Sequence, residues 1–181
     1  MKTYLIILLF PFLMQQQNNY QIDFGEEKKG LYWSVVNDGV MGGLSRGRKK
    51  LTKNSLLFKG NVSLDNNGGF SSLRRSFSEF DISNFEYVEI KYRSSGISLA
   101  LTFAVSRRWY VPNYKVSLDR TSSKWKTTTI KLTDFKKHYI GKAMNEQLEK
   151  EALKEIIRIG LITDEKKYGS FEFEVDYIKF K

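Results

Sequence analysis

Residues 33–47, WSVVNDGVMGGLSRG, combine residue types that could support three kinds of chemistry. The run GLSRG at residues 43–47 matches the G-x-S-x-G pattern of serine hydrolases, in which Ser45 would attack a carbonyl carbon. The glycines could let the backbone surround a phosphate group, and Asn37 and Asp38 could donate oxygens to a calcium ion. Each kind of chemistry requires particular neighbours in the chain, so each can be tested against the sequence.

Ser45 lacks the surroundings of a hydrolase nucleophile. A nucleophile elbow needs a strand that leads directly to the serine and a helix that follows it. Here the flexible NDGVMGG precedes Ser45, and RGRKKLTKNS, which follows it, has no apolar face of helical spacing. The one histidine, His138, lies in DFKKHYIG, which is typical of the exit of a strand. The sequence therefore predicts no catalytic set and a protein that is not an enzyme.

The glycines and the acidic pair fit neither a phosphate site nor a metal site. The P-loop and the dinucleotide fingerprint require spacings that the glycines at positions 39, 42, 43 and 47 do not match. One Asn–Asp pair is a small ligand set for calcium, and the chain has no cysteine for a thiolate site. We therefore predict no cofactor and no metal. We interpret the glycines as positions of positive φ or close backbone approach, and Asn37 and Asp38 as residues that close turns through side-chain hydrogen bonds.

Two further stretches carry candidate binding residues. In DNNGGFSSLRRSF, at residues 65–77, the Asn-Gly pair is a hairpin signal, and we hypothesise that Arg75 forms an ion pair with Asp38 that joins the two glycine-rich loops. In RRWYVPNY, at residues 107–114, aromatic residues with nearby arginines could form a platform for a sugar. The glycan-binding candidates are Trp109, Tyr110 and Tyr114. The alternative is that these residues only cap the core where two strands are joined.

Alternation of apolar and polar residues predicts the elements that position these loops. From Leu56 onward the alternation has a period of two, as in strands that are buried on one face. The segment at 97–105 has one strongly apolar face and one face of small residues. We predict about nine strands, near residues 30–36, 55–64, 69–75, 88–93, 97–105, 114–118, 128–132, 156–162 and 171–177. In the last strand Glu172, Glu174 and Asp176 would form a solvated face opposite lysines.

One segment has helical spacing. Leu148, Ala152, Leu153 and Ile156 recur as on one face of a helix over residues 145–156. Helices do not alternate with the strands, which excludes a doubly wound sheet. The predicted fold is therefore all-β, a single β-sandwich with one short helix.

The N-terminal residues are predicted to lie outside this domain. Residues 4–14 are apolar, too short a run to span a bilayer but typical of a secretory signal peptide. We therefore expect a signal peptide or short hydrophobic segment at residues 1–19, a domain at residues 20–181, and export to the periplasm or the exterior. An uncleaved membrane anchor is the alternative. The net charge of +10 would attract anionic polymers or membrane surfaces. The basic doublets are scattered and not interleaved with stacking aromatics, so we predict no nucleic-acid partner.

The two glycine-rich stretches together resemble the complex I intermediate-associated protein 30 family. The resemblance rests on Trp33, VNDGVMGGLS at residues 36–45 and NGGFSSLR at residues 67–74, and it extends through the C-terminal GSFEFEVDYIKF. It covers roughly residues 24–181. The motif positions that it places in this chain are Trp33, Asn37, Asp38, Gly39, Met41, Gly42, Gly43, Ser45, Gly69, Phe70 and Ser72, with the motif's arginine at Arg74 or Arg75.

The resemblance implies a jelly-roll sandwich of the galactose-binding-like type and a non-catalytic protein. Relatives in this family help to assemble respiratory complex I, which implies that the motif residues shape a surface for a protein partner such as a respiratory-complex subunit. The N-terminus departs from that role, because it is similar to a secretory leader and not to an Arg-rich mitochondrial presequence. Two hypotheses follow: a binding and assembly module acting through protein–protein contacts, and a secreted carbohydrate-binding β-sandwich with an aromatic platform.

Overall fold

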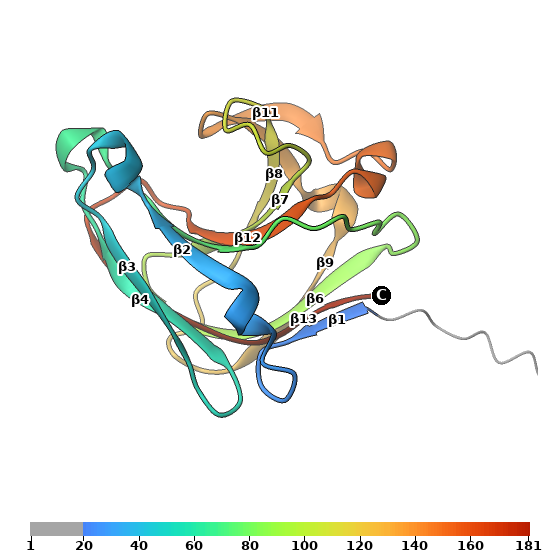
Figure 1. Ribbon diagram of the computed structural model, residues 1–181, viewed down its shortest axis with the longest axis horizontal. Helices are drawn as coiled ribbons and strands as arrows, with labels where there is room; N and C mark the ends of the chain where they lie inside the picture. The colour runs from blue at the N-terminus through green and yellow to red at the C-terminus, as the bar shows by residue number, and fades with distance from the viewer. Residues whose placement is uncertain (1–19) are drawn as a thin grey trace, which may run out of the picture.

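The protein is a two-layer sandwich of antiparallel strands (Figure 1). The computed structural model describes residues 20–181, which contain thirteen strands and five short 3-10 turns but no α-helix. The predicted signal peptide at residues 1–19 lies outside the described residues. In residues 20–181 no helix has the length and apolar content needed to cross a membrane.

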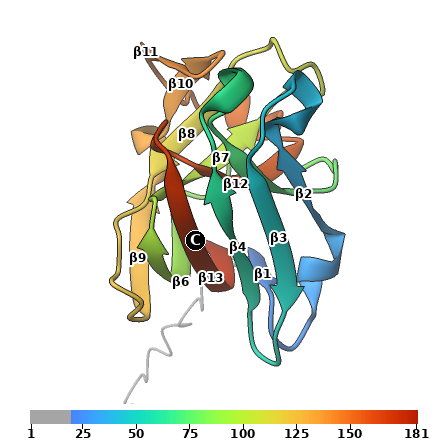
Figure 2. The ribbon, with the colours of Figure 1, turned by 90° about the vertical axis from the view of Figure 1, so that its left-hand side faces the viewer.

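The first layer, sheet I, has β13 at its centre. Figure 2 shows β9, β6, β13, β4 and β3 following one another across it, and β1 pairs with the C-terminal half of β13. Its strands are β1 (Tyr20–Asp23), β3 (Arg46–Leu51), β4 (Leu56–Val62), β6 (Tyr87–Gly96), β9 (Lys126–Lys131) and β13 (Gly169–Phe180).

The second layer, sheet II, has the strand order β11-β10-β8-β7-β12-β5-β2. Its strands are β2 (Trp33–Asn37), β5 (Ser71–Arg75), β7 (Leu99–Ala104), β8 (Asn113–Ser117), β10 (Lys136–Tyr139), β11 (Lys142–Gln147) and β12 (Arg158–Thr163). Two of the 3-10 turns at which the chain crosses between the sheets carry the glycine-rich loops: η2 (Asp38–Met41) from β2 to β3 and η3 (Asp65–Asn67) from β4 to β5. The other 3-10 turns are η1 (Lys29–Tyr32), η4 (Leu132–Asp134) and η5 (Glu151–Lys154).

The core lies between the sheets and is rich in aromatic rings. Phe103 of β7 stacks on Phe135 with ring centroids 4.3 Å apart, and Tyr92 of β6 stacks on Phe173 of β13 at 5.0 Å. All four side chains are buried. Offset aromatic pairs of this kind add to the stabilisation that comes from burial alone. The all-β sandwich predicted from alternation is therefore confirmed, and each of the nine predicted strands is present.

The predicted helix over residues 145–156 is wrong. Residues 142–147 form β11, and only η5 has helical character. Leu148 and Ile156 are buried as expected, but their backbone groups bond to other segments: the Leu148 N–H donates to the Phe135 carbonyl at 2.8 Å, and the Ile156 carbonyl accepts from the Phe80 N–H at 2.8 Å. Backbone hydrogen bonds to distant segments thus take the place of the hydrogen bonds within a helix that the local spacing of apolar residues favoured.

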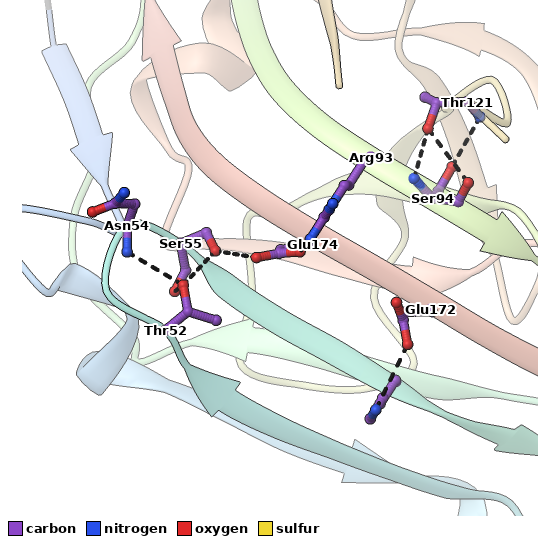
Figure 3. A network of polar contacts seen from close by, with 9 residues as sticks. Thr52, Asn54, Ser55, Arg93, Ser94, Thr121, Glu172 and Glu174 are labelled. Carbon is purple, nitrogen blue, oxygen red and sulfur yellow. Dashed lines mark hydrogen bonds and ion pairs between the residues drawn. The ribbon is translucent and has the colours of Figure 1, made fainter. Parts of the chain in front are cut away.

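The carboxylates of β13 are ion-paired on the outer face of sheet I (Figure 3). Glu172 lies 3.7 Å from Lys59, and Asp176 lies 2.7 Å from Lys91. Glu174 is buried, with 8% of its surface exposed, and accepts a bond of 2.7 Å from the Arg93 Nε–H. The predicted pairing with lysines is therefore right for Glu172 and Asp176. Glu174 is instead buried and pairs with an arginine.

Candidate functional site

The carboxylate of Asp38 is the centre of a buried hydrogen-bond network at the crossover from β2 to β3. Asp38 is 1% exposed. Its Oδ1 accepts from the Ser45 N–H at 2.9 Å, and its Oδ2 accepts from the Ser45 hydroxyl at 2.5 Å. The same Oδ2 accepts from the N–H groups of Gly69 and Phe70 at 2.7 and 3.2 Å. One side chain thus holds the two glycine-rich loops together.

Asn37 makes a second tie between the sheets. Its Oδ1 accepts from the Gly47 N–H of β3 at 2.9 Å and from the Ser71 hydroxyl of β5 at 2.6 Å. Ser45 extends the network to the end of β4, because its Oγ accepts from the Ser63 N–H at 3.0 Å. Asn37 and Asp38 therefore use side-chain hydrogen bonds as expected, but these bonds join separate loops and strands where the closing of local turns was expected.

Two glycines of these loops leave space that Asp38 fills. A Cβ at Gly43 would lie 2.4 Å from the Asp38 side chain, and a Cβ at Gly68 would lie 2.7 Å from its Oδ2. Gly42 ends η2 with a φ of 87°, a conformation that side chains disfavour. The glycine-rich sequence therefore allows close approach to a carboxylate of the same chain.

Two carboxyl groups with lowered pKa values, Asp38 and Glu165, make the stability of the fold depend on pH. Burial raises the pKa of Asp38, but hydrogen bonds from Ser45, Gly69 and Phe70 outweigh it and hold the pKa below its usual value of 3.8. Hydrogen bonds from Lys167 and Ser98 lower the pKa of Glu165 from 4.5 to about 2. A carboxyl with a lowered folded pKa stabilises the fold above its unfolded pKa, and this stabilisation is lost as the pH falls through the folded value.

We expect the free energy of unfolding to fall between about pH 5 and pH 2, because the unfolded chain takes up protons first. Urea titrations followed by tryptophan fluorescence at a series of pH values would measure this. The slope should be shallower in Asp38→Asn. An equal free energy of unfolding at about pH 5 and pH 2 would contradict the lowered pKa values of Asp38 and Glu165.

The structure turns most motif side chains inward. Trp33 is fully buried, and Asp38, Ser45 and Ser72 are at most 2% exposed. Gly43 is buried and Gly69 and Phe70 are half-buried, whereas Gly39 and Gly42 are exposed. The side chain of Met41 lies outside the described part of the structure. The motif therefore builds the corner of the sandwich, and its buried side chains cannot themselves contact a partner.

The hypothesised ion pair between Asp38 and Arg75 is absent from residues 20–181. Arg75 lies opposite Trp33, at the far end of the β2–β5 pair from Asn37 and Asp38. Its guanidinium donates to the Tyr20 hydroxyl at 3.1 Å and lies 4.0 Å from the ring centroid of Phe80. Backbone N–H groups bind Asp38 where an arginine was expected.

Ser45 and His138 form no catalytic pair. Ser45 is buried, bonds to Asp38 and leads into strand β3 and not into a helix. His138 lies on β10 of sheet II, where its Nδ1 contacts the Lys136 carbonyl at 3.0 Å. Within residues 20–181, no three His, Cys, Asp or Glu side chains gather as a metal site requires.

Two hollows remain as candidate ligand sites. The larger, of about 520 Å³, lies on sheet I among charged and polar residues of β3, β4 and β13, and its one aromatic residue, Phe171, is 2% exposed. The smaller, of about 170 Å³, lies on the outer face of sheet II beside Trp109. We call this second hollow the Trp109 groove. Of these two hollows, the Trp109 groove is the one that combines an exposed aromatic ring with polar groups, as ligand sites usually do.

Small residues form the floor of the Trp109 groove. Thr102 and Ala104 of β7 point outward because Leu101 and Phe103 point into the core. On the neighbouring strand β12, Gly160 lies opposite Thr102, and its missing side chain leaves room for the Thr102 hydroxyl, which would lie 2.8 Å from a Cβ there. The face of small residues that the sequence indicated at 97–105 thus becomes the base of a groove.

Two of the three glycan-binding candidates are exposed and the third is buried. Trp109 and Tyr110, in the loop between β7 and β8, are 75% and 47% exposed, and their rings meet edge to face with centroids 5.9 Å apart. Tyr114 lies on β8 opposite Phe103 and faces the core, where burial raises its pKa. Trp109 therefore lines the groove, Tyr110 packs against Trp109, and Tyr114 belongs to the core.

Two groove residues were missed in the sequence. Arg74 and Arg158 line the Trp109 groove together with Arg107. Alternation could have placed each arginine on the outer face of its strand, because the neighbouring Leu73 and Ile159 are buried, but it could not have shown that the two strands pair.

Solved structures share the fold. A family 11 carbohydrate-binding module of a cellulosomal cellulase from Clostridium thermocellum has a TM-score of 0.67 and 19% identity, covering 90% of this chain and 94% of the module. The same kind of module in complex with a β-1,3-1,4-mixed-linked tetrasaccharide has a TM-score of 0.64, 19% identity and the same coverage. An agarase, AgWH50C, matches at a TM-score of 0.58 and 8% identity over 89% of this chain, which is 24% of the agarase. These neighbours are similar in fold, a β-sandwich of the galactose-binding-like type.

Sequence comparison gives the family. No curated protein matches this chain significantly. A family model described as Complex I intermediate-associated protein 30 (CIA30) matches residues 22–175, a span that includes both glycine-rich loops, the Asp38 network and every strand except the ends of β1 and β13. The chain therefore belongs to the complex I intermediate-associated protein 30 family.

Proposed function

We propose that this protein is a non-catalytic binding module that holds a carbohydrate chain in the Trp109 groove. The observation that carries the proposal is the ring of Trp109, which lines the groove, is 75% exposed and packs edge to face against Tyr110. A tryptophan gains much by burying its ring, so one left in solvent beside a groove favours a ligand that covers it.

The shape of the site suits a sugar. A sugar ring has an apolar face that can lie on an aromatic ring and hydroxyl groups at its edge that need polar partners. The groove supplies both: the indole of Trp109 on one side, and the side chains of Thr102 and Asn113 among its polar lining residues. The mixed-linked tetrasaccharide bound by the family 11 module supports the proposal only in that the fold can carry a sugar.

Trp109→Ala is expected to weaken binding of a glycan identified on a glycan array by at least about tenfold, because the stacking surface is removed. Calorimetry would measure the change in the dissociation constant. Trp125→Ala is the matched control, since Trp125 is 43% exposed but contacts Lys91 and Arg93 of sheet I. Equal losses in the two variants, or none in either, would contradict a site at Trp109.

A second candidate is an assembly contact with a protein partner, and family membership favours it. Exposed hydrophobic side chains lie at the end of sheet II that carries the β7–β8 loop. There Tyr139, the last residue of β10, is 45% exposed, and Ile140, which follows it, is 58% exposed. Cross-linking and pull-down with the protein and with Ile140→Lys would test this. Capture of a partner that Ile140→Lys loses would support it, and tight glycan binding with no partner would reject it.

Export is part of the proposal. The apolar run at residues 4–14 would direct the chain out of the cytoplasm, where polysaccharides are accessible. Sequencing the N-terminus of the mature protein after cell fractionation tests this point: a cytoplasmic protein that retains Met1 would reject it.

A further inference from the structure

Four arginines line the Trp109 groove, Arg74, Arg107, Arg108 and Arg158, and three of them gather around Phe77 and Ser72 without an acidic partner in the described residues. These three are Arg74 of β5, Arg158 of β12 and Arg107 of the β7–β8 loop. Among residues 20–181, none of the three forms an ion pair, and residues 1–19 contain no Asp or Glu. Elsewhere on the same face Lys115 is paired with Asp164 at 2.6 Å. The groove therefore concentrates positive charge that the chain does not neutralise.

The arginines are held partly out of water. The guanidinium carbon of Arg158 lies over Phe77, 3.4 Å from the ring centroid, and the Nε atom of Arg158 is buried without a hydrogen-bond partner in the described residues. Arg107 lies over the same ring at 4.8 Å. Arg74 is half-buried, and its Nε–H donates to the Ser72 hydroxyl at 2.9 Å.

Burial and mutual repulsion act on these charges. Burial, with the charges of Arg74 and Arg107, lowers the pKa of Arg158 from its ordinary value to about 10, and burial also lowers the pKa of Arg74. A desolvated cluster of like charges costs free energy in the unbound protein. An anion in the groove would offset that cost, and the planar guanidinium matches the paired oxygens of a carboxylate or sulfate group.

We infer that Arg74, Arg107 and Arg158 form an anion subsite that accepts a sulfate ester or a carboxylate carried by an acidic polysaccharide. The anion site follows from the arginines alone, whereas its assignment to a polysaccharide rests on the proposed function. Trp109 would stack on the sugar, and the arginines would bind the acidic group that the sugar carries.

The first test uses polymers that share a backbone. Calorimetry at a fixed ionic strength would compare dextran with dextran sulfate, and polygalacturonate would supply carboxylates in place of sulfates. We expect binding of an acidic polymer that Arg107→Gln weakens at least about tenfold. Arg107 is exposed, so this variant should keep the fold. Arg48→Gln, at an exposed position on sheet I, removes the same charge and should leave the affinity within about twofold, because general attraction to a basic protein is weakly specific.

The second test uses inorganic sulfate and separates the two claims. NMR of the arginine side chains should show the Arg158 Nε–H signal moving as sodium sulfate replaces chloride at constant ionic strength. Arg74→Met should abolish this shift without lowering the melting temperature in sulfate-free buffer, because it removes one repelling charge.

The two tests distinguish the anion site from its assignment to a polysaccharide. A sulfate response at Arg158 with no polysaccharide bound would reject the sugar and keep the anion site. Tight binding of neutral dextran, unchanged by Arg107→Gln, would keep the proposed function and overturn the anion site. Equal losses in Arg107→Gln and Arg48→Gln would also overturn it, since binding would then follow total charge. A loss of melting temperature in Arg74→Met would show a structural role for that arginine and contradict the inference.

Discussion

Asp38→Ala is expected to lower the free energy of unfolding by at least about 3 kcal/mol. The carboxylate of Asp38 accepts four hydrogen bonds while it is 1% exposed. Its removal leaves three backbone N–H groups and the Ser45 hydroxyl without their acceptor, in a space where water has little access. Each unpaired buried donor costs about 1–3 kcal/mol, and partial relaxation keeps the total below the sum. Chemical denaturation followed by tryptophan fluorescence would measure the loss.

Asp65→Ala is the matched control for this variant. Asp65 lies in η3, at the second crossover, but it is exposed and its carboxylate bonds only to nearby Ser63. We expect a change of about 1 kcal/mol or less. Similar losses of unfolding free energy in Asp38→Ala and Asp65→Ala would mean that the two aspartates stabilise the crossovers equally. That result would contradict a network centred on Asp38.

Gly60→Ala is expected to destabilise the sandwich by about 1–3 kcal/mol. A Cβ at Gly60 of β4 would lie 1.9 Å from the Arg46 carbonyl oxygen, a backbone atom of β3 that cannot move without opening the strand pair. Overpacking against backbone is relieved only by shifting the strand. The midpoint of a urea titration would report the loss.

Gly39→Ala provides the comparison for Gly60→Ala. A Cβ at Gly39 meets nothing within 4 Å, although this glycine belongs to the NDGVMGG run. The expected change is within about 0.5 kcal/mol. A larger loss at Gly39 than at Gly60 would mean that the run is needed for something other than the contacts described above.

The strands were predictable where one face is buried and the other is polar. Leu99, Leu101 and Phe103 alternate with small residues, and this pattern alone gives β7 and its inward face. The sequence RGRKKL of β3 has no such pattern, because the strand lies at the edge of sheet I and exposes its charged residues. Edge strands such as β3 and the fully exposed β11 are formed by pairing with a neighbour, which a local pattern does not report.

The candidate site was predictable only in part for a related reason. Trp109 and Tyr110 could be recognised from their residue types in RRWYVPNY, and the same types wrongly included Tyr114, which alternation along β8 turns toward the core. Arg74 and Arg158 are more than eighty positions apart in sequence and meet only because β5 and β12 are neighbours in sheet II. Strand order depends on long-range pairing, so no local pattern could bring these two charges together.

The NDGVMGG run of the family motif is therefore separate from the Trp109 groove in this chain, whereas Ser72 and Arg74 of the second motif stretch lie at the groove. The Asn37–Asp38 network joins the two sheets at one corner and buries the side chains that distinguish the motif. The Trp109 groove opens on the outer face of sheet II and uses residues outside the NDGVMGG run. A shared motif then explains a shared fold, while the ligand is set by the groove.

Titration of the isotope-labelled protein with a short dextran sulfate, followed by amide and indole NMR, tests this separation most directly. We predict that the Trp109 indole N–H, the amides of residues 106–110 and the Arg158 side chain shift, while the amides of Ser45, Gly69 and Phe70 stay in place. Shifts that gather at Ser45, Gly69 and Phe70, with the Trp109 indole unmoved, would contradict the account.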